Sequence, residues 1–157
     1  MEQRINVFEK GQNAMKALYG LGMYLAKSQI GQSLLNLIYY RVSQINGCAY
    51  CLDMHSKDLR ANGETEQRLY VLEAWREAPF YSERERAALA WAEAATKVTE
   101  GRIPDEVYEE VRKQFSEGET IDLTLAVITI NSYNRINVAF RPAVGTYQPS
   151  SCAAQTN

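Results

Sequence analysis

Two of the three cysteines and the only histidine of the chain fall within eight consecutive residues, Cys48 to His55. Any fold of this chain has to accommodate these reactive side chains close together. If a helix starts near Asn46 and Gly47, Cys48 lies in its first turn, and Cys51 and His55 follow at spacings of three and four residues. All three side chains then share one helix face. The sequence therefore predicts a Cys-x-x-Cys motif at a helix N-terminus, followed by a base.

The spacing of these three residues indicates thiol redox chemistry. Only a thiolate attacks a peroxide or a disulfide, and the pKa of a cysteine falls at a helix N-terminus and within a Cys-x-x-Cys pair. One helical turn, about 6 Å along the axis, separates His55 from Cys51, whereas Cys48 is about 10.5 Å away. We therefore expect Cys51 to attack, with His55 as its base, and Cys48 to close a disulfide onto the oxidised Cys51.

Length and charge narrow the possible classes of protein. A chain of 157 residues is ordinarily one domain that buries a single core, and a net charge of −2 with a pI near 5.5 offers no basic surface for nucleic acid. The first 30 residues do not resemble a signal peptide, and no apolar run is long enough for a membrane span. We expect a soluble cytoplasmic protein, where a close cysteine pair is more often catalytic or metal-binding than structural. Cys152 lies in a polar tail and has no assigned role.

Apolar residues recur at helical spacing through most of the chain, which predicts an all-α protein of about six to seven helices. Residues 120–139 are rich in isoleucine and valine, but their length without Gly or Pro favours a helix over a strand. The predicted domain covers residues 1–142, and residues 143–157 are predicted to be a disordered tail. Residues 7–28 are predicted to form one or two helices, with a break near residues 19–22. The further predicted helices cover residues 32–46, the cysteine helix to about residue 62, and residues 64–77, 82–98, 105–115 and 120–139. A capping box opens the helix over 82–98, and Gly118 separates the last two helices.

The run from Val42 to His55 strongly resembles the core of the alkylhydroperoxidase (AhpD-like) and carboxymuconolactone decarboxylase family. The similarity extends through residues 60–64, 74–76, 83–93 and 130–135. It implies an all-helical homo-oligomer, commonly a trimer or hexamer. Members of this family with Cys-x-x-Cys and the following histidine reduce hydroperoxides: the second cysteine attacks, the first resolves, and the histidine relays a proton. The resemblance therefore implies a thiol-dependent peroxidase that acts on alkyl hydroperoxides or hydrogen peroxide and takes its electrons from a dithiol or a thiol protein. We expect no cofactor and no metal.

This chain departs from the family pattern at two positions. The peroxidatic members carry a glutamate twelve residues before the first cysteine, where this chain has Asn36, and some carry a second histidine where this chain has Tyr50. An amide neither titrates nor orients an imidazolium by charge. We consider Glu93 the first candidate, and Glu83 the second, for an acid that completes the proton relay from another helix.

Other interpretations remain open at this stage. A zinc site lacks a second Cys/His pair, and a thioredoxin fold lacks the βαβ context of its motif. Decarboxylation of a carboxymuconolactone-like lactone acid and redox sensing by a helical oligomer are the alternative functions, while an inert packing role would leave the cysteines without chemistry. Several other residues suit packing or hydrogen bonding near the site: Trp75 and Trp91 in the core or a subunit interface, Tyr39 and Tyr40 beside the thiols, and Asn131, Asn134 and Arg135 on the last helix.

Overall fold

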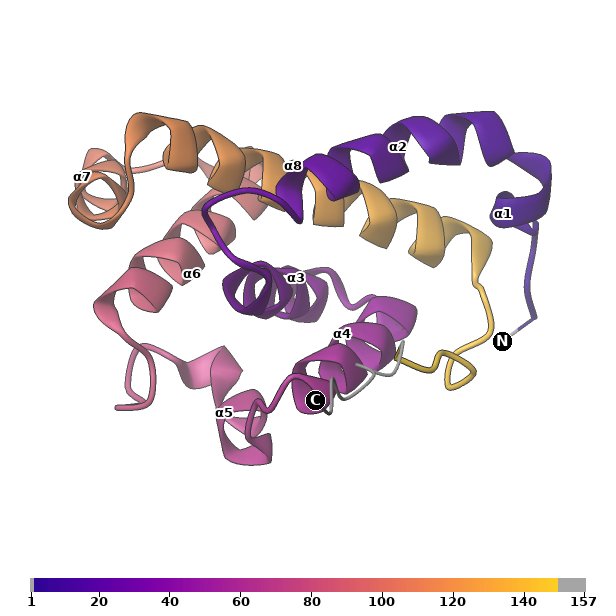
Figure 1. Ribbon diagram of the computed structural model, residues 1–157, viewed down its shortest axis with the longest axis horizontal. Coiled ribbons are helices and arrows are strands. Elements are labelled where there is room, and N and C mark those ends of the chain that lie inside the picture. The colour runs from indigo at the N-terminus through magenta and orange to yellow at the C-terminus, as the bar shows by residue number, and fades with distance from the viewer. Residues whose placement is uncertain (1, 150–157) are drawn as a thin grey trace, which may run out of the picture.

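The computed structural model describes residues 2–149, and every regular element within them is a helix (Figure 1). This confirms the predicted all-α class. The elements in chain order are α1 (Val7–Lys10), α2 (Gln12–Leu25), α3 (Gln32–Asn46), α4 (Ala49–Ala61), α5 (Glu66–Tyr70), the 3-10 helix η1 (Leu72–Ala74), α6 (Glu83–Thr96), the 3-10 helix η2 (Val98–Glu100), α7 (Asp105–Gln114) and α8 (Glu117–Phe140).

Helix α3 is the centre of the fold. It packs against α4, α6 and α8, which surround it in Figure 1. Residues 34–38 are consequently buried on all sides of the helix, although the sequence pattern predicts an amphipathic one. Each buried leucine or isoleucine contributes about 1.5–3 kcal/mol relative to exposure, so this stretch anchors the core.

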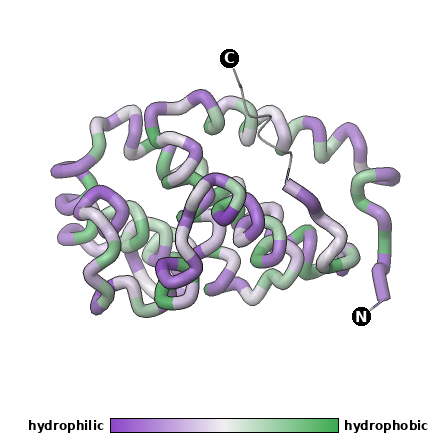
Figure 2. The backbone as a smooth tube through the Cα atoms, turned by 60° about the horizontal axis from the view of Figure 1, so that its bottom comes forward, coloured by the Kyte–Doolittle hydropathy of each residue, from purple (hydrophilic) through white to green (hydrophobic). Residues whose placement is uncertain are grey.

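Apolar and polar residues alternate along the helices, as the colours of Figure 2 show. Within residues 2–149, no helix combines the length and the apolar character that crossing a membrane requires.

Turn geometry places the cysteine motif. Gly47 caps α3 in the left-handed conformation, with φ 62°, which an L side chain rarely adopts. The chain reverses there, and Cys48 becomes the N-cap residue of α4. The predicted Cys-x-x-Cys motif at a helix N-terminus is therefore confirmed, and the packing of α4 against α3 fixes its position.

Three predicted boundaries are wrong. The first helical region breaks at Gly11, and α2 continues through Gly20 and Gly22 because it packs along α8, which outweighs the cost of about 1 kcal/mol for each helical glycine. The last helix begins at Glu117, so Gly118 lies inside it, because a capping box between Ser116 and Glu119 sets the start.

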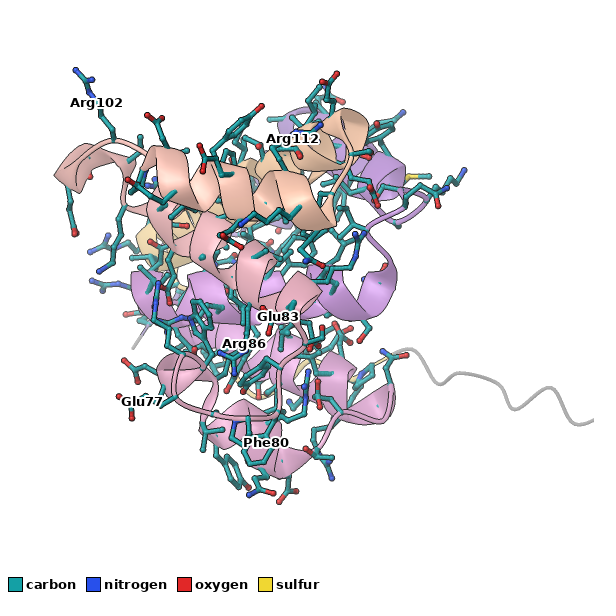
Figure 3. All side chains as sticks on the ribbon, turned by 90° about the vertical axis from the view of Figure 1, so that its left-hand side faces the viewer. Glu77, Phe80, Glu83, Arg86, Arg102 and Arg112 are labelled. Atoms are coloured by element: carbon teal, nitrogen blue, oxygen red, sulfur yellow. The ribbon has the colours of Figure 1, made fainter. Side chains whose placement is uncertain are left out.

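The third wrong boundary is the helix predicted over residues 64–77, which divides into α5 and η1. Figure 3 looks onto this end of the molecule, where Phe80 precedes α6 and Arg86 lies one turn inside it. The Arg86 side chain donates to the backbone carbonyls of Trp75, Ala78 and Tyr81. These bonds hold the chain in a loop where a continuous helix would have to extend.

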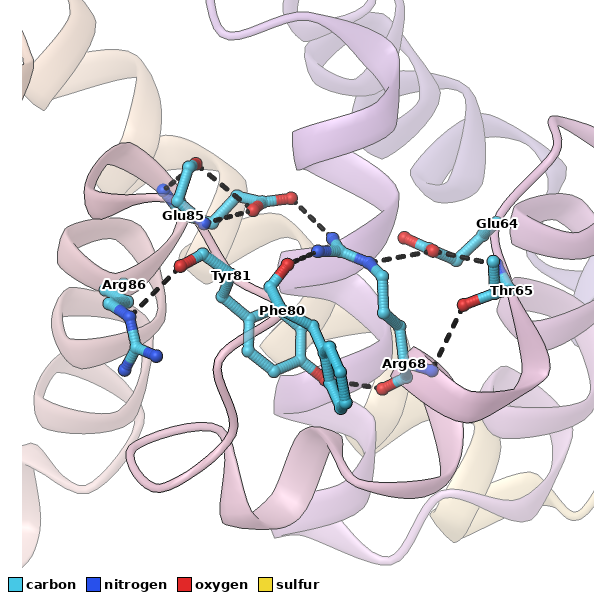
Figure 4. A network of polar contacts seen from close by, with 8 residues as sticks. Glu64, Thr65, Arg68, Phe80, Tyr81, Glu85 and Arg86 are labelled. Carbon is cyan, nitrogen blue, oxygen red and sulfur yellow. Dashed lines mark hydrogen bonds and ion pairs between the residues drawn. The ribbon is translucent and has the colours of Figure 1, made fainter.

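Arg68 ties α5 to the start of α6 (Figure 4). Its guanidinium donates to Glu64 at 2.9 Å, to Glu85 at 2.6 Å and to the carbonyl of Phe80, while the Tyr81 hydroxyl donates to the Arg68 carbonyl. The Ser82–Glu85 capping box predicted for α6 is present beside this network. The network also explains why the helix predicted over residues 64–77 is broken, since it bends the chain around the half-buried Arg68.

The segment after α8 has no regular structure but lies along α4. Lys57 Nζ donates to the carbonyls of Gly145 at 3.3 Å and Tyr147 at 3.0 Å, and the Tyr147 hydroxyl donates to Asp58 at 2.7 Å. Gly145 and Tyr147, which lie in the predicted disordered tail, are therefore bonded to α4, and such isolated contacts leave no periodic pattern in the sequence. Residues 150–157, including Cys152, lie outside the described residues.

Candidate active site

The two cysteines at the start of α4 are in direct contact. The Sγ atoms of Cys48 and Cys51 lie 2.7 Å apart, both as free thiols, with the Cys48 thiol donating to Cys51. Cys51 is fully buried and Cys48 is 1% exposed. The pair is close enough to form a disulfide without rearrangement of the helix.

The surroundings acidify one of these thiols and not the other. Hydrogen bonding from Cys48 lowers the pKa of Cys51 to about 7 against the opposing effect of burial, and Asn137, Asn134 and Ser43 lower it further. The Asn137 side-chain amide donates to Cys51 Sγ at 3.2 Å. The pKa of Cys48 is raised instead, because its proton is held in the bond to Cys51 and its thiol is buried. Cys51 is therefore the thiol that ionises near neutral pH.

A series of amides on α8 surrounds the sulfur pair. Asn46 donates to Asn131 at 3.0 Å and to Asn134 at 2.8 Å, and Asn134 donates to Ser43 Oγ at 3.0 Å. Asn134 is therefore a buried hydrogen-bonding residue near the site, as expected, whereas Asn131 is joined to it only through Asn46. The exposed Arg135 turns back to Asn131, 2.7 Å away, so it does not approach the thiols.

Sequence reasoning missed Asn137 and Ser43. Asn137 is the residue that contacts the reactive sulfur directly, and it lies 86 positions from Cys51. Its spacing of three residues from Asn134 would have placed both amides on one face of the last helix. Nothing in the sequence marks that face as the one that meets the cysteines.

His55 is buried, with only 6% of its surface exposed, and its ring centroid lies 5.3 Å from that of Tyr39. Within residues 2–149, its Nδ1 atom has no hydrogen-bond partner. Burial lowers the pKa of His55 to about 4, so the imidazole is neutral at pH 7. His55 consequently gives the Cys51 thiolate no positive charge, and neutral hydrogen-bond donors stabilise the thiolate instead.

A chamber of about 440 Å³ opens beside His55. Asn137 also lines it, which places this chamber next to the residue that contacts Cys51 Sγ. Among the residues that the structure describes, no Lys, Arg, Asp or Glu contributes to its wall. The rest of its lining is Phe8, Tyr19, Gly22, Ala26, Gln32, Leu35, Tyr39, Tyr50, Met54, Thr129, Ile130, Tyr133 and Tyr147.

The acids considered for the proton relay lie elsewhere. Glu93 accepts from Arg41 at 2.8 Å, from Trp75 at 2.9 Å and from Arg76 at 2.6 Å. Burial acts to raise its pKa, but these three donors outweigh burial and lower it. Glu93 therefore anchors α6 to α3 and does not meet His55, and Glu83 lies exposed in the first turn of α6 (Figure 3).

Asn36 occupies the position of the family's relay glutamate. It is buried on α3, accepts from Gln32 Nε2 at 2.9 Å, and lines a separate cavity with Leu59 and Arg68. Across residues 2–149, no three Cys, His, Asp or Glu side chains gather in a way that could hold a metal ion.

Known proteins resemble this chain over most of its length. YdfG of Bacillus subtilis (strain 168), an uncharacterized protein, is 45% identical over 139 residues, which cover 88% of this chain and 95% of YdfG. The crystal structure of ATU0492 from Agrobacterium tumefaciens, a protein of unknown function that has been related to the antioxidant defence protein AhpD, superposes with a TM-score of 0.88 at 40% identity. That match covers 93% of this chain and all of ATU0492.

A more distant solved structure, the debrominase Bmp8, has a TM-score of 0.75 at 25% identity and covers 87% of this chain and 74% of Bmp8. The sequence profile of the carboxymuconolactone decarboxylase family matches residues 11–94, which include both buried cysteines and His55. On this match and the similarity to YdfG, the chain belongs to the carboxymuconolactone decarboxylase family.

Proposed function

We propose that this protein is a thiol-dependent peroxidase that reduces hydroperoxides through the Cys48–Cys51 pair. The observation that carries the proposal is the asymmetry of two touching thiols, of which only Cys51 is acidified. A peroxidatic thiol has to be a thiolate at neutral pH, and a resolving thiol has to lie within disulfide distance. Both conditions hold in this site, and the similarity to ATU0492 supports the same reading.

In the proposed reaction, the Cys51 thiolate attacks the terminal oxygen of the hydroperoxide. The O–O bond breaks, the alcohol oxygen leaves with the electron pair and takes a proton, and Cys51 becomes a sulfenic acid. Cys48 then attacks the Cys51 sulfur, the S–S bond forms, and the hydroxide leaves with the Cys48 proton as water. The proton that Cys51 gives up on ionising balances the one that the alcohol oxygen takes. His55 lies in the chamber wall where the alcohol is released, and we assign it the relay of this proton from Cys51 to that oxygen.

The chamber favours hydroperoxides with an apolar body, such as alkyl hydroperoxides, over hydrogen peroxide. Its aromatic wall gains free energy from apolar contact and offers few polar groups to a small polar molecule. The same wall argues against a lactone acid as substrate, because within the described part of the chain no arginine or lysine lines the chamber to bind a carboxylate. A redox sensor differs from a peroxidase in turnover, since it reacts once for each reduction.

Reductive dehalogenation is a second candidate. The neighbour Bmp8 is a debrominase, and an aromatic chamber beside a dithiol would suit a halogenated aromatic ring. Such a reaction replaces the halogen by hydrogen and consumes two thiols, which become a disulfide, with release of halide and a proton. Release of bromide from a brominated aromatic substrate, at a rate exceeding hydroperoxide consumption, would favour this candidate.

The peroxidase proposal is tested with Cys51→Ser and Cys48→Ser variants. We expect Cys51→Ser to lose its reaction with cumene hydroperoxide, whereas Cys48→Ser should react once and stop at a sulfenic acid. Mass spectrometry after one equivalent of hydroperoxide, with a sulfenic-acid trap, distinguishes these products. A sulfenic acid on Cys48 in a fully reactive Cys51→Ser variant would reverse the assignment of the two cysteines.

A further inference from the structure

Cys48 lines a different opening from the one beside His55. Cys48 lines a groove of about 650 Å³ between the start of α4 and the chain that follows α8. Cys51 lines neither this groove nor the chamber, and His55 lines only the chamber. The further residues around the groove are Gly47, Ala49, Tyr50, Asn137, Val138, Arg141, Pro142, Ala143 and Val144.

Tyr50 and Asn137 line both openings and therefore lie where the two meet. Asn137 lies on α8 and contacts Cys51 Sγ, while Tyr50 lies on α4 between the two cysteines in sequence. A molecule that enters through the groove therefore meets Cys48 before Cys51. Neither cysteine lines the chamber: a molecule there meets His55 and Asn137, and Asn137 is the residue that contacts Cys51 Sγ.

We propose that the groove is the binding site of the reductant: a dithiol enters there and attacks the Cys48 sulfur of the oxidised pair, while the hydroperoxide uses the chamber. This assignment rests on the proposed function and adds to it a second binding site, for the dithiol class of ligand. The two half-reactions then use two openings and a single disulfide.

The proposed reduction balances in two steps. A donor thiolate attacks Cys48 Sγ, the Cys48–Cys51 bond breaks, and the electron pair goes to Cys51 Sγ, where the Asn137 amide stabilises the charge. The second thiol of the donor then attacks the donor sulfur bound to Cys48, so that the donor leaves as a disulfide and Cys48 regains a proton. Attack at Cys48 makes Cys51 the leaving group, and the thiol with the lower pKa leaves faster.

The test follows reduction alone. The protein is first oxidised to the Cys48–Cys51 disulfide with diamide, so the experiment does not require peroxidase activity. The result can therefore be interpreted even if the proposed peroxidase function is wrong. Reduction by dithiothreitol, and in a parallel arm by a short peptide carrying Cys-x-x-Cys, is followed by counting free thiols. The two arms distinguish a free dithiol from one carried on a polypeptide.

Ala49→Phe fills the groove from an exposed position in the first turn of α4. We expect this variant to be reduced roughly tenfold or more slowly than the native protein by whichever donor, dithiothreitol or the peptide, enters through the groove. Ala61→Phe, at an exposed alanine at the other end of the same helix, is the matched control and should reduce at the native rate. Ala26→Phe fills the chamber and should slow oxidation by cumene hydroperoxide.

Mapping of the mixed disulfide gives an answer that does not depend on how any variant folds. The oxidised native protein is mixed with excess 2-mercaptoethanol, quenched with an alkylating reagent, and digested for mass spectrometry. The adduct is expected on Cys48. An adduct on Cys51, or native reduction rates for Ala49→Phe in both arms, would overturn the proposal.

Discussion

The unpaired Nδ1 atom of His55 is the residue-level feature that most affects the chemistry of this site. A buried imidazole without a partner resists protonation, which is why its pKa falls to about 4. Position 36 is linked to His55 through two residues that each lie one helical turn away. Asn36 shares a cavity with Leu59, one turn beyond His55, and Tyr39, one turn beyond Asn36, packs on the His55 ring.

Asn36→Glu should therefore supply the missing carboxylate and raise the pKa of His55. His55 is the only histidine, so the proton NMR signals of a single imidazole report the change directly. At pH 7 the variant should hold more imidazolium and react faster with hydroperoxide, up to the 10²–10⁴-fold that is roughly the value of a well-placed acid–base group. Asn36→Gln, which extends the side chain without charge, is the control. An unchanged His55 titration in Asn36→Glu would contradict this account.

The same pKa predicts how acid affects stability. The folded pKa of His55 lies below the unfolded value of about 6.5, so the unfolded chain binds a proton that the native protein cannot. The lowered pKa of His55 therefore contributes about 3 kcal/mol to the free energy of unfolding. This contribution is fully present above pH 6.5 and is lost as the pH falls towards 4. In Asn36→Glu this loss should be smaller, which urea unfolding at pH 7 and pH 5 measures.

At the scale of elements, α8 adds to the acidification of Cys51 that the hydrogen bond from Cys48 begins. It places Asn131, Asn134 and Asn137 at intervals of three residues, and two of these amides act on the Cys51 sulfur. Neutral dipoles from one helix thus replace the positive neighbour that a reactive thiolate often uses. The Cys51 pKa of about 7 then depends on the packing of α8 against α3 and α4.

Asn137→Leu keeps a similar volume and removes the donor, so it should raise the pKa of Cys51. The rate of Cys51 alkylation by iodoacetamide, measured against pH in a Cys48→Ser background that is common to all variants, should have its midpoint at higher pH. Near neutral pH the variant should react more slowly, and the two rates should converge at high pH, where both thiols are ionised. Asn131→Leu, whose amide contacts Asn46, Thr96 and Val127, is the control. A shift as large in the control would show a general packing effect.

At the scale of the whole molecule, α2 and α8 leave apolar side chains in water. Met23 is 66% exposed and Ile121 is 62% exposed, and Tyr24 joins the two helices by donating to Asp122 at 2.8 Å. These helices run side by side across the top of Figure 1. Contiguous exposed apolar surface often marks a protein–protein interface.

We therefore expect a homo-oligomer, a trimer or a hexamer, that covers this surface. Light scattering should give a mass several times the 17.8 kDa of one chain. In the double variant Met23→Glu/Ile121→Glu the measured mass should fall towards that of a single chain, because burying an unpaired charge in the interface is costly. Val98→Glu, at an exposed apolar residue in η2, should keep the native mass. A monodisperse monomer of the native protein at micromolar concentration would refute the expectation.

The local features of this protein follow from its sequence because neighbouring residues determine them. The grouping of Cys48, Cys51 and His55, the left-handed turn at Gly47 and the Ser82–Glu85 capping box all involve residues within a few positions of one another. Helical periodicity placed most of the helices for the same reason. The boundaries that differed are those where another contact intervened. Packing on α8 outweighed the glycines of α2, a capping box outweighed Gly118, and side-chain bonds to the backbone divided residues 64–77.

Only the tertiary structure decided the electrostatics of the site. The contact between Asn137 and Cys51, the neutral state of His55 and the binding of Glu93 by Arg41 join residues that are far apart in the chain or depend on burial from several helices. The identity of a residue specifies which bonds it can make, and packing selects among them. The sequence therefore determined that two thiols and an imidazole would share one helix, while the packing of α8 against α3 and α4 added the amide donors to Cys51 and, within the described residues, left the imidazole without a carboxylate.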